Sequence, residues 1–347
     1  MNLIFFQLFI DLKHQYCQCW YHVPMNENVK LTASGASTVL VDQEFADQRI
    51  DNFLMSRLKG VPRSHVYRLL RTGQVRVNGG RIQASYRLKG GDAVRIPPHR
   101  HTDTVVPEDQ PWLQQRLVGR ILYEDDWLLV LDKPAGMAVH GGTGLQAGVI
   151  ELLRQMRPDA RHLELVHRLD RDTSGCLMIS RKRSALRVLH QQFRGDDISK
   201  TYIALLDGVW RKASQTVDAP LQKNVLQSGE RMVRVHRDGK HAVTLFRNLE
   251  CFADSTLVEA SPVTGRTHQI RVHAQHMGYP LLGDERYGRE VSNRLYRERA
   301  LKRLFLHAAS LSFVHPSSHE RISVQAPLAE DLQKVLEQMR RLPVNRK

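Results

Sequence analysis

The sequence is poor in cysteine and lacks an apolar run long enough to cross a membrane. Only four cysteines occur in 347 residues. Cys17 and Cys19 are separated by a single residue, which suits neither a tetrahedral zinc site nor a redox pair. The four thiols do not form a disulfide framework, so we expect reduced cysteines in a cytoplasmic protein. We expect no membrane contact, because neither a spanning segment nor a lipidation signal is present.

Several nucleotide-binding and catalytic motifs are missing as well. Neither the dinucleotide-binding glycine pattern nor the P-loop occurs, and no serine elbow or cysteine nucleophile stands out. The segment that begins at His167 is not a kinase catalytic loop, because the required Asn does not follow it. His268, His273 and His276 lack the spacing of metal ligands, so we expect no metal site.

The charge balance is strongly basic. The chain has 51 Lys and Arg residues against 36 Asp and Glu residues, a formal net charge of +15. Its apolar content of 41% and charged content of 25% are those of an ordinary globular protein. An excess of this size favours a polyanionic partner, and nucleic acid before a membrane. The length allows one large domain and one small domain.

Residues 1–24 differ from the rest of the chain. The apolar stretch from Leu3 to Ile10 resembles the core of a signal peptide, but no basic segment precedes it and no small-residue cleavage site follows it. Ordinary polar composition begins near Met25. We therefore expect residues 1–24 to be a non-native upstream extension and Met25 to be the true start.

A small basic α/β unit is predicted over residues 42–98. Two helix patterns precede a short strand that runs into the tight-turn signal Asn78-Gly79. Residues 44–100 hold twelve Lys and Arg residues against four acidic residues. Four of these arginines gather around the second helix and the strand after it: Arg63, Arg68, Arg71 and Arg76. Such clustering favours nucleic-acid binding over a merely solvated basic face. Residues 49–54 and 75–79 resemble the RNA-binding module named after small-subunit ribosomal protein four.

A second, larger domain is predicted over residues 119–330. Proline and polar residues at positions 99–118 predict a linker before it, and residues 331–347 are expected to be a C-terminal tail. Strand patterns outnumber helix patterns in this domain, and short turns join many of the strands. This favours an α+β fold with a mixed, largely antiparallel central sheet flanked by helices.

A dense group of charges lies between two apolar runs of the large domain, at residues 167–175. Asp170 is at its centre, with Arg168 and Arg171 beside it. Charged side chains that are removed from water must be paired or hydrogen-bonded. A group of this kind is therefore expected to hold a particular side chain or ligand in place. A carboxylate among cations stays ionised, which suits a nucleophile better than a proton donor. A structural ion-pair loop is an equally good interpretation of this segment alone.

The large domain resembles the pseudouridine synthases of the RluA family, and the similarity runs from about residue 42 to residue 330. The segments that carry the resemblance are His167-Arg168-Leu169-Asp170 with Thr173-Ser174-Gly175, Lys200-Thr201-Tyr202, residues 265–273 (Gly-Arg-Thr-His-Gln-Ile-Arg-Val-His), Gly283-Asp284 and residues 131–136 (Leu-Asp-Lys-Pro-Ala-Gly). The resemblance implies the pseudouridine synthase fold. It also implies that the reaction is an isomerisation, which needs no cofactor and no metal.

The resemblance assigns roles to individual residues. It implies that Asp170 is the nucleophile, that Arg271 holds it ionised and oriented, and that Tyr202 stacks on the base or handles a proton. Arg168 is expected to fill the space left by the extruded base, with His167 and Thr173 beside it at the substrate. Tyr202 as a packing residue and Arg168 as a phosphate clamp remain alternatives.

The expected function is the conversion of uridine to pseudouridine in large-subunit ribosomal RNA by a protein that acts as a monomer. After Asp170 attacks, at the uracil ring or at the anomeric carbon of the sugar, the base detaches, turns and re-attaches through carbon. Two alternatives remain: a non-catalytic RNA-binding factor of ribosome assembly, and a synthase for transfer RNA.

Overall fold

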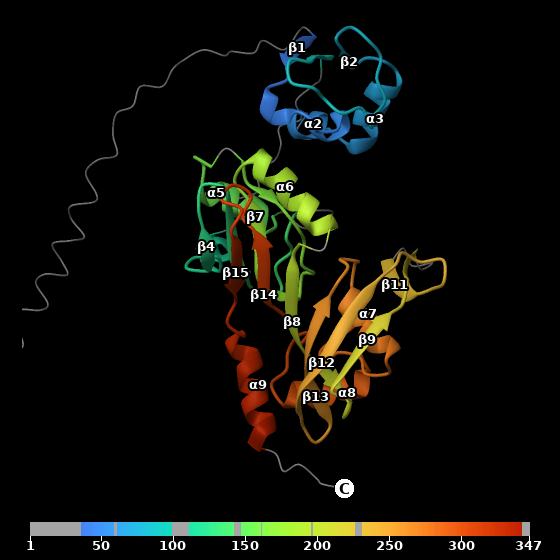
Figure 1. The fold of residues 1–347 in the computed structure, drawn as a ribbon, viewed down its shortest axis with the longest axis vertical. Coiled ribbons are helices and arrows are strands. Elements are labelled where there is room, and N and C mark those ends of the chain that lie inside the picture. Colours follow the sequence, from blue (N-terminus) through green and yellow to red (C-terminus); the bar gives the residue numbers. More distant parts are fainter. Residues whose placement is uncertain are drawn as a thin grey trace, which may run out of the picture. The chain divides into compact units, whose positions relative to one another are not determined.

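The computed structural model describes residues 36–58, 61–98, 111–141, 147–160, 162–195, 197–225 and 231–341. The predicted extension at residues 1–24 and the first part of the predicted linker lie outside these ranges. The chain divides into two compact units, one up to Thr104 and the other from Val105 (Figure 1). In the described segments, no helix has the length and apolar character needed to span a membrane.

The small unit is a three-stranded antiparallel sheet with two helices. Its elements are β1 (Ser37–Leu40), a short 3-10 helix η1 (Gln43–Phe45), α2 (Ile50–Arg57), α3 (Arg63–Arg71), β2 (Arg76–Val77) and β3 (Ala93–Ile96), and the strand order is β1-β3-β2. Positive φ angles of 51° at Asn78 and 78° at Gly79 form the predicted tight turn, since both residue types tolerate this backbone. Ile50, Phe53 and Val66 are among the fully buried residues of its core.

The large unit is built on one ten-stranded sheet. Its elements in chain order are α4 (Pro111–Gln115), β4 (Ile121–Glu124), β5 (Leu128–Lys133), α5 (Val149–Met156), β6 (Glu164–Leu165), β7 (Ser174–Ser180), α6 (Arg183–Arg194), β8 (Ser199–Asp207), β9 (Ser214–Asp218), β10 (Leu221–Val225), β11 (Arg231–Val235), β12 (Val243–Cys251), β13 (Ser255–Pro262), α7 (Gln269–His276), α8 (Glu290–Glu298), β14 (Leu306–Val314), β15 (Arg321–Gln325) and α9 (Glu330–Arg341). The strand order is β4-β5-β7-β14-β8-β13-β12-β9, with β15 paired to β14 and β6 to β7. Strands β10 and β11 form a separate hairpin.

The sheet is mixed and largely antiparallel, as the sequence predicts. Among the strand pairs of the sheet, β7 with β14 is parallel and the others are antiparallel. Strand β14 is central because it pairs with β7, β8 and β15. This junction places the start of β7 one strand away from Tyr202 and Ile203 of β8.

The predicted linker and the predicted C-terminal tail both differ from the structure. Within the predicted linker, Pro111–Gln115 forms helix α4, and Leu117 is buried in the core of the large unit. The predicted tail begins inside helix α9, which buries Leu332, Val335, Leu336 and Met339 in that unit. An apolar stripe at helical spacing explains this docking.

Candidate active site

Asp170 lies in a tight turn immediately before β7. The Thr173 amide donates to the Asp170 carbonyl at 3.2 Å, which closes the turn. Leu169 and Thr173 are buried, whereas the Asp170 side chain is 23% exposed. The turn therefore anchors the backbone on both sides of Asp170 and leaves its carboxylate accessible.

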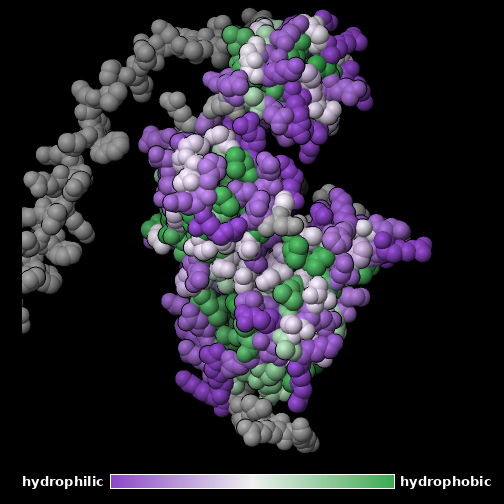
Figure 2. Space-filling view, in the orientation of Figure 1, coloured by the Kyte–Doolittle hydropathy of each residue, from purple (hydrophilic) through white to green (hydrophobic). Residues whose placement is uncertain are grey.

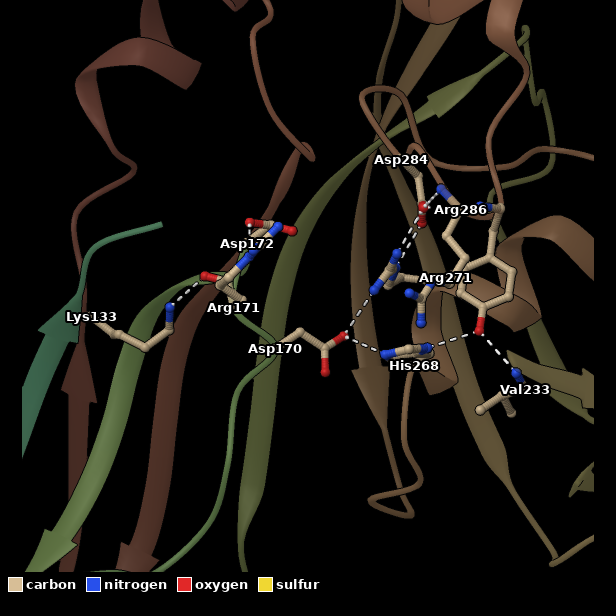
Figure 3. A network of polar contacts seen from close by, with 10 residues as sticks. Lys133, Asp170, Arg171, Asp172, Val233, His268, Arg271, Asp284 and Arg286 are labelled. Carbon is tan, nitrogen blue, oxygen red and sulfur yellow. Dashed lines mark hydrogen bonds and ion pairs between the residues drawn. The ribbon is translucent and has the colours of Figure 1, made fainter. Parts of the chain in front are cut away.

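The buried Lys133 side chain is hydrogen-bonded to the backbone of this turn. Lys133 is the last residue of β5, and its Nζ donates to the carbonyl oxygens of Pro134, Met137 and Arg171 at 2.8–2.9 Å (Figure 3). The Gly136 amide donates to the same Arg171 carbonyl at 2.9 Å. Burial lowers the pKa of Lys133 to about 7, and the charge of Asp172 opposes that shift. Three carbonyl acceptors match the three protons of an ammonium group, so the contacts favour the charged form.

Glycine is required where the turn enters β7. Gly175 has φ +104°, and a Cβ atom built there would lie 2.2 Å from the Ala308 carbonyl oxygen. This close approach pairs β7 with β14 at Gly175 and Ala308. Ala308 is also opposite Tyr202 on β8. The glycine thus lets the Asp170 turn approach Tyr202 across a single strand.

Arg271, on helix α7, is in contact with two carboxylates. Its Nε and Nη2 donate to Asp284 at 2.7 and 2.8 Å, and its Nη1 donates to Asp170 Oδ2 at 3.2 Å (Figure 3). Burial alone would lower the pKa of Arg271, but the hydrogen bonds and charges of Asp284 and Asp170 outweigh it and raise the pKa. The two-pronged pair with buried Asp284 fixes the guanidinium plane, so Nη1 is directed at Asp170.

Asp284 is buried and fully partnered. Besides Arg271, it accepts hydrogen bonds from the backbone amides of Arg286 and Tyr287, each at 3.0 Å. Burial would raise the pKa of Asp284, but the Arg271 hydrogen bond and charge lower it overall. Asp284 is therefore a charged support for Arg271.

His268 also faces the carboxylate of Asp170. Its Nε2 lies 3.8 Å from Asp170 Oδ2, and its Nδ1 lies 2.8 Å from the Tyr287 hydroxyl oxygen. The guanidinium of Arg271 lies over the Tyr287 ring, 5.0 Å from its centre. Burial lowers the pKa of His268, although the charge of Asp170 opposes the shift. Arg271 and His268 therefore meet at one oxygen of Asp170.

Tyr202 is packed between two clusters of core residues, on the central strand β8. Burial raises the pKa of its hydroxyl, and the charge of Asp170 raises it further. The phenol is thus neutral, and only β14 separates its strand from β7, which follows the Asp170 turn. This arrangement fits the predicted base-stacking role and also the alternative of a packing residue.

The remaining predicted substrate residues have different surroundings. Arg168 is exposed, two residues before Asp170. His167 points into the fold: its Nε2 accepts from the Met178 amide at 3.0 Å, and its ring stacks on Phe193 at 4.9 Å. Burial lowers the pKa of His167 to about 3. The ring of half-buried His167 is therefore engaged within the fold, and its place at the substrate stays a prediction.

Thr173 and His273 likewise have structural partners. Thr173 is buried, and its amide closes the Asp170 turn, while its place at the substrate stays a prediction. His273 bonds through one ring nitrogen to Thr244 Oγ1 at 2.9 Å and through the other to the Ala219 carbonyl at 3.0 Å. Within the described ranges, no three His, Cys, Asp or Glu residues are grouped as metal ligands.

Four residues of the site had no role predicted from the sequence: Lys133, His268, Asp284 and Tyr287. Three of them, all but Tyr287, lie in the quoted motifs. Their roles depend on partners that are distant in sequence, which motif spacing does not reveal. A charged residue shortly after an apolar run inside a motif is the signal that could have pointed to Lys133 and Asp284.

The predicted RNA-binding arginines lie on the surface of the small unit. All four are exposed: Arg63, Arg68, Arg71 and Arg76. Arg68 and Arg71 line a concavity together with Arg81 and Tyr67. Figure 2 shows polar colours over much of the visible surface of this unit. Exposed guanidinium groups around a shallow hollow suit contacts with a phosphate backbone.

Comparison with known proteins identifies the family. A model described as RNA pseudouridylate synthase matches residues 127–276, and an S4 domain model matches residues 48–94. Over 316 residues, 90% of this chain and 99% of the relative, the sequence is 53% identical to ribosomal large subunit pseudouridine synthase C of Salmonella typhi. The chain belongs to the RNA pseudouridylate synthase family.

A second relative and a solved structure also match this chain. The synthase C of Escherichia coli K12 is 52% identical over the same 316 residues, with 90% and 99% of the two chains covered. The solved human RNA pseudouridylate synthase domain containing 4 is 26% identical, with a TM-score of 0.54 over 66% of this chain and 96% of that chain. These similarities confirm the predicted fold class, the family and the assignment as a pseudouridine synthase.

Proposed function

We propose that this pseudouridine synthase acts on uridines of large-subunit ribosomal RNA, with Asp170 as its nucleophile. The observation that carries the proposal is the Asp170 carboxylate, part-exposed and held at 3.2 Å by Arg271, which is itself fixed by buried Asp284. A nucleophile needs this combination of access and fixed orientation. The substrate class follows the names of the relatives that share half of their sequence with this chain.

The chemistry exchanges one glycosidic bond for another. Asp170 attacks at the uracil ring or at the anomeric carbon, and the bond from N1 of uracil to C1′ of the sugar breaks. After the base turns, C5 bonds to C1′ and the bond to Asp170 breaks, which returns the free carboxylate. C5 then loses its proton and N1 gains one, so the atoms of the nucleoside and the enzyme balance. Neutral Tyr202, close to Asp170, is suited to stack on the base or to carry the proton.

Exposed Arg168 is proposed to enter the gap in the RNA helix left by the flipped uridine. Its position two residues before Asp170 puts it on the same turn-bearing segment as the nucleophile. Unstacking a base costs a few kcal/mol, and an inserted guanidinium offsets part of this cost. A phosphate clamp is the alternative role for the same side chain.

Replacing the nucleophile tests the proposal directly. Asp170→Asn keeps the shape of the side chain but removes its nucleophilic charge, so we expect turnover to fall by at least about 10⁴-fold while RNA binding is preserved. Turnover is measured as tritium released from C5-labelled uridine in a large-subunit ribosomal RNA transcript, with a transfer RNA transcript as the competing substrate. Measurable turnover by this variant would remove Asp170 from its role, and preference for transfer RNA would overturn the substrate.

We further propose a cytoplasmic enzyme that acts as a monomer. We also propose that it needs no metal or cofactor, because the reaction neither adds nor removes a group. Treatment with a chelator should leave the tritium-release rate unchanged. A rate that falls and then recovers on addition of one metal ion would contradict the metal-free mechanism.

A further inference from the structure

We infer that His268 is a positioning residue that, together with Arg271, fixes which oxygen of Asp170 attacks the substrate, and that Tyr287 sets the orientation of the His268 proton. This inference rests on the proposed role of Asp170 as the nucleophile. It gives a function to two side chains that the proposed chemistry does not use.

Both positioning groups face the same carboxylate oxygen. Arg271 Nη1 lies 3.2 Å from Asp170 Oδ2, and His268 Nε2 lies 3.8 Å from that oxygen (Figure 3). Within the described part of the chain, Asp170 Oδ1 has no hydrogen bond or ion pair to a side chain. The Arg271 hydrogen bond, with the His268 ring nearby at more than hydrogen-bond distance, restrains rotation of the carboxylate and leaves Oδ1 as the oxygen that meets the substrate.

Tyr287 determines which ring nitrogen of His268 carries the proton. The Val233 amide of strand β11 donates to the Tyr287 hydroxyl oxygen at 3.0 Å. The hydroxyl still has its own proton to donate, and His268 Nδ1, at 2.8 Å, is the acceptor. With Nδ1 accepting, the proton of the neutral ring sits on Nε2 and points at Asp170.

The charges around His268 agree with a neutral ring. The charged groups that act on it are Asp170 and Asp284, and Arg271 and Arg286. Two cations oppose two anions, and burial disfavours a third positive charge. A neutral donor orients Asp170 without taking its nucleophilic charge.

The backbone at His268 supports a requirement for this side chain. His268 has φ +53° and ψ +21°, a left-handed conformation, directly before helix α7. Glycine or asparagine is the more usual occupant of such a position. A histidine kept at a strained position, with both ring nitrogens directed at site residues, indicates that the ring itself is used.

Two substitutions separate a positioning role from a backbone role. In His268→Asn, the amide replaces Nδ1 and suits the left-handed backbone, but it is too short to reach Asp170. In His268→Gln, the longer amide places a donor near the position of Nε2. A positioning role therefore predicts that the His268→Gln variant is more active than the His268→Asn variant. A purely structural role predicts the opposite order of activities.

Tritium release from a C5-labelled large-subunit ribosomal RNA transcript, at saturating RNA, gives kcat for each variant. We expect His268→Asn to lose about tenfold in kcat, because the polar contact of the ring with the charged Asp170 carboxylate is lost, with little change in RNA affinity. His268→Gln should recover most of that loss. Tyr287→Phe should lower kcat in the parent enzyme but add little to the effect of His268→Asn, because the two act through one contact with Asp170.

His319 supplies the matched control. It is an exposed histidine of the same unit with a similar φ of +60°. His319→Asn and His319→Gln change the same side chain on the same kind of backbone, so they report the conformational effect alone, by thermal unfolding and by kcat.

The outcomes distinguish this inference from the proposed function. If Asp170→Asn is inactive and Gln does not exceed Asn at position 268, the positioning role of His268 is overturned and the nucleophile stands. If Asp170→Asn is active, the proposed function itself fails.

Discussion

Arg271 shows why a single residue type is needed at the centre of the site. Its planar guanidinium binds Asp284 through two nitrogens and still has Nη1 for Asp170. A lysine has one charged nitrogen and could not hold both carboxylates in fixed directions. The sequence predicted the Asp170–Arg271 pair through family resemblance, and the structure places the two groups in contact.

His167 gives a prediction at the same scale. Its folded pKa is about 3, against an ordinary value of 6.5. As the pH falls from 6.5 towards 3, the unfolded chain binds a proton at this ring and the folded chain does not, so stability falls by at most about 1.4 kcal/mol per pH unit. Above pH 6.5 both states are neutral and this contribution is constant.

Urea unfolding of the parent and of His167→Gln at pH 7 and pH 4 measures this contribution. Gln can accept from the Met178 amide but does not titrate. We expect the loss of stability between the two pH values to be about 3 kcal/mol smaller in the variant. Equal losses in both proteins would show that the ring is not a buried neutral group.

At the scale of elements, the pairing of β7 with β14 decides where Asp170 lies. It joins two strands that are far apart in sequence, at Ser174–Gly175 and His307–Ala308. The Ser174 hydroxyl lies 2.9 Å from His307 Nδ1 across this pair. Because β14 also pairs with β8, the same strand fixes the positions of Asp170 and Tyr202 relative to each other.

Gly175→Ala tests this junction. The added methyl group would meet the Ala308 carbonyl at 2.2 Å, on a backbone with φ +104°. We expect a loss of about 2–4 kcal/mol in unfolding free energy, together with reduced kcat, because the Asp170 turn must move away from β14. Gly265→Ala is the control in urea unfolding, since a Cβ there meets nothing within 4 Å. Equal stabilities of the two variants would contradict a tight junction.

At the scale of the whole molecule, basic charge is concentrated in the small unit. Twelve of the 51 Lys and Arg residues lie between positions 44 and 100. The S4 domain match covers residues 48–94 of this segment. This unit is therefore suited to supply RNA affinity, while the large unit carries the candidate catalytic residues.

The salt dependence of RNA binding tests this division of labour. Each phosphate contact contributes about −0.7 to −0.9 to the slope of log K against log salt concentration. We expect Arg68→Gln with Arg71→Gln to make the slope shallower by up to about 1.8, measured by filter binding of a ribosomal RNA transcript.

The control keeps the same change of net charge. Arg294→Gln with Arg297→Gln alters two exposed arginines of helix α8. If both double variants change the slope equally, general charge rather than the small unit governs binding.

The sequence by itself determined the features that depend on neighbouring residues. The Asn78-Gly79 turn, the apolar alternation of the strands and the basic cluster follow from local backbone preference, side-chain period and charge. Motif resemblance added the family and the identity of Asp170, Tyr202 and Arg271. His167 and Thr173 have contacts within the fold that the motif did not predict, because a motif does not reveal whether a side chain points into the core or towards solvent.

Only the tertiary structure decided how these residues meet. Asp170 and Arg271 are 101 residues apart in the chain and 3.2 Å apart in space. The pairing of β14 with both β7 and β8, and the support of Arg271 by Asp284, set this geometry. Contacts of His268 with Tyr287 and of Lys133 with three carbonyls likewise arise only after folding, because their partners are brought together by packing rather than by sequence spacing.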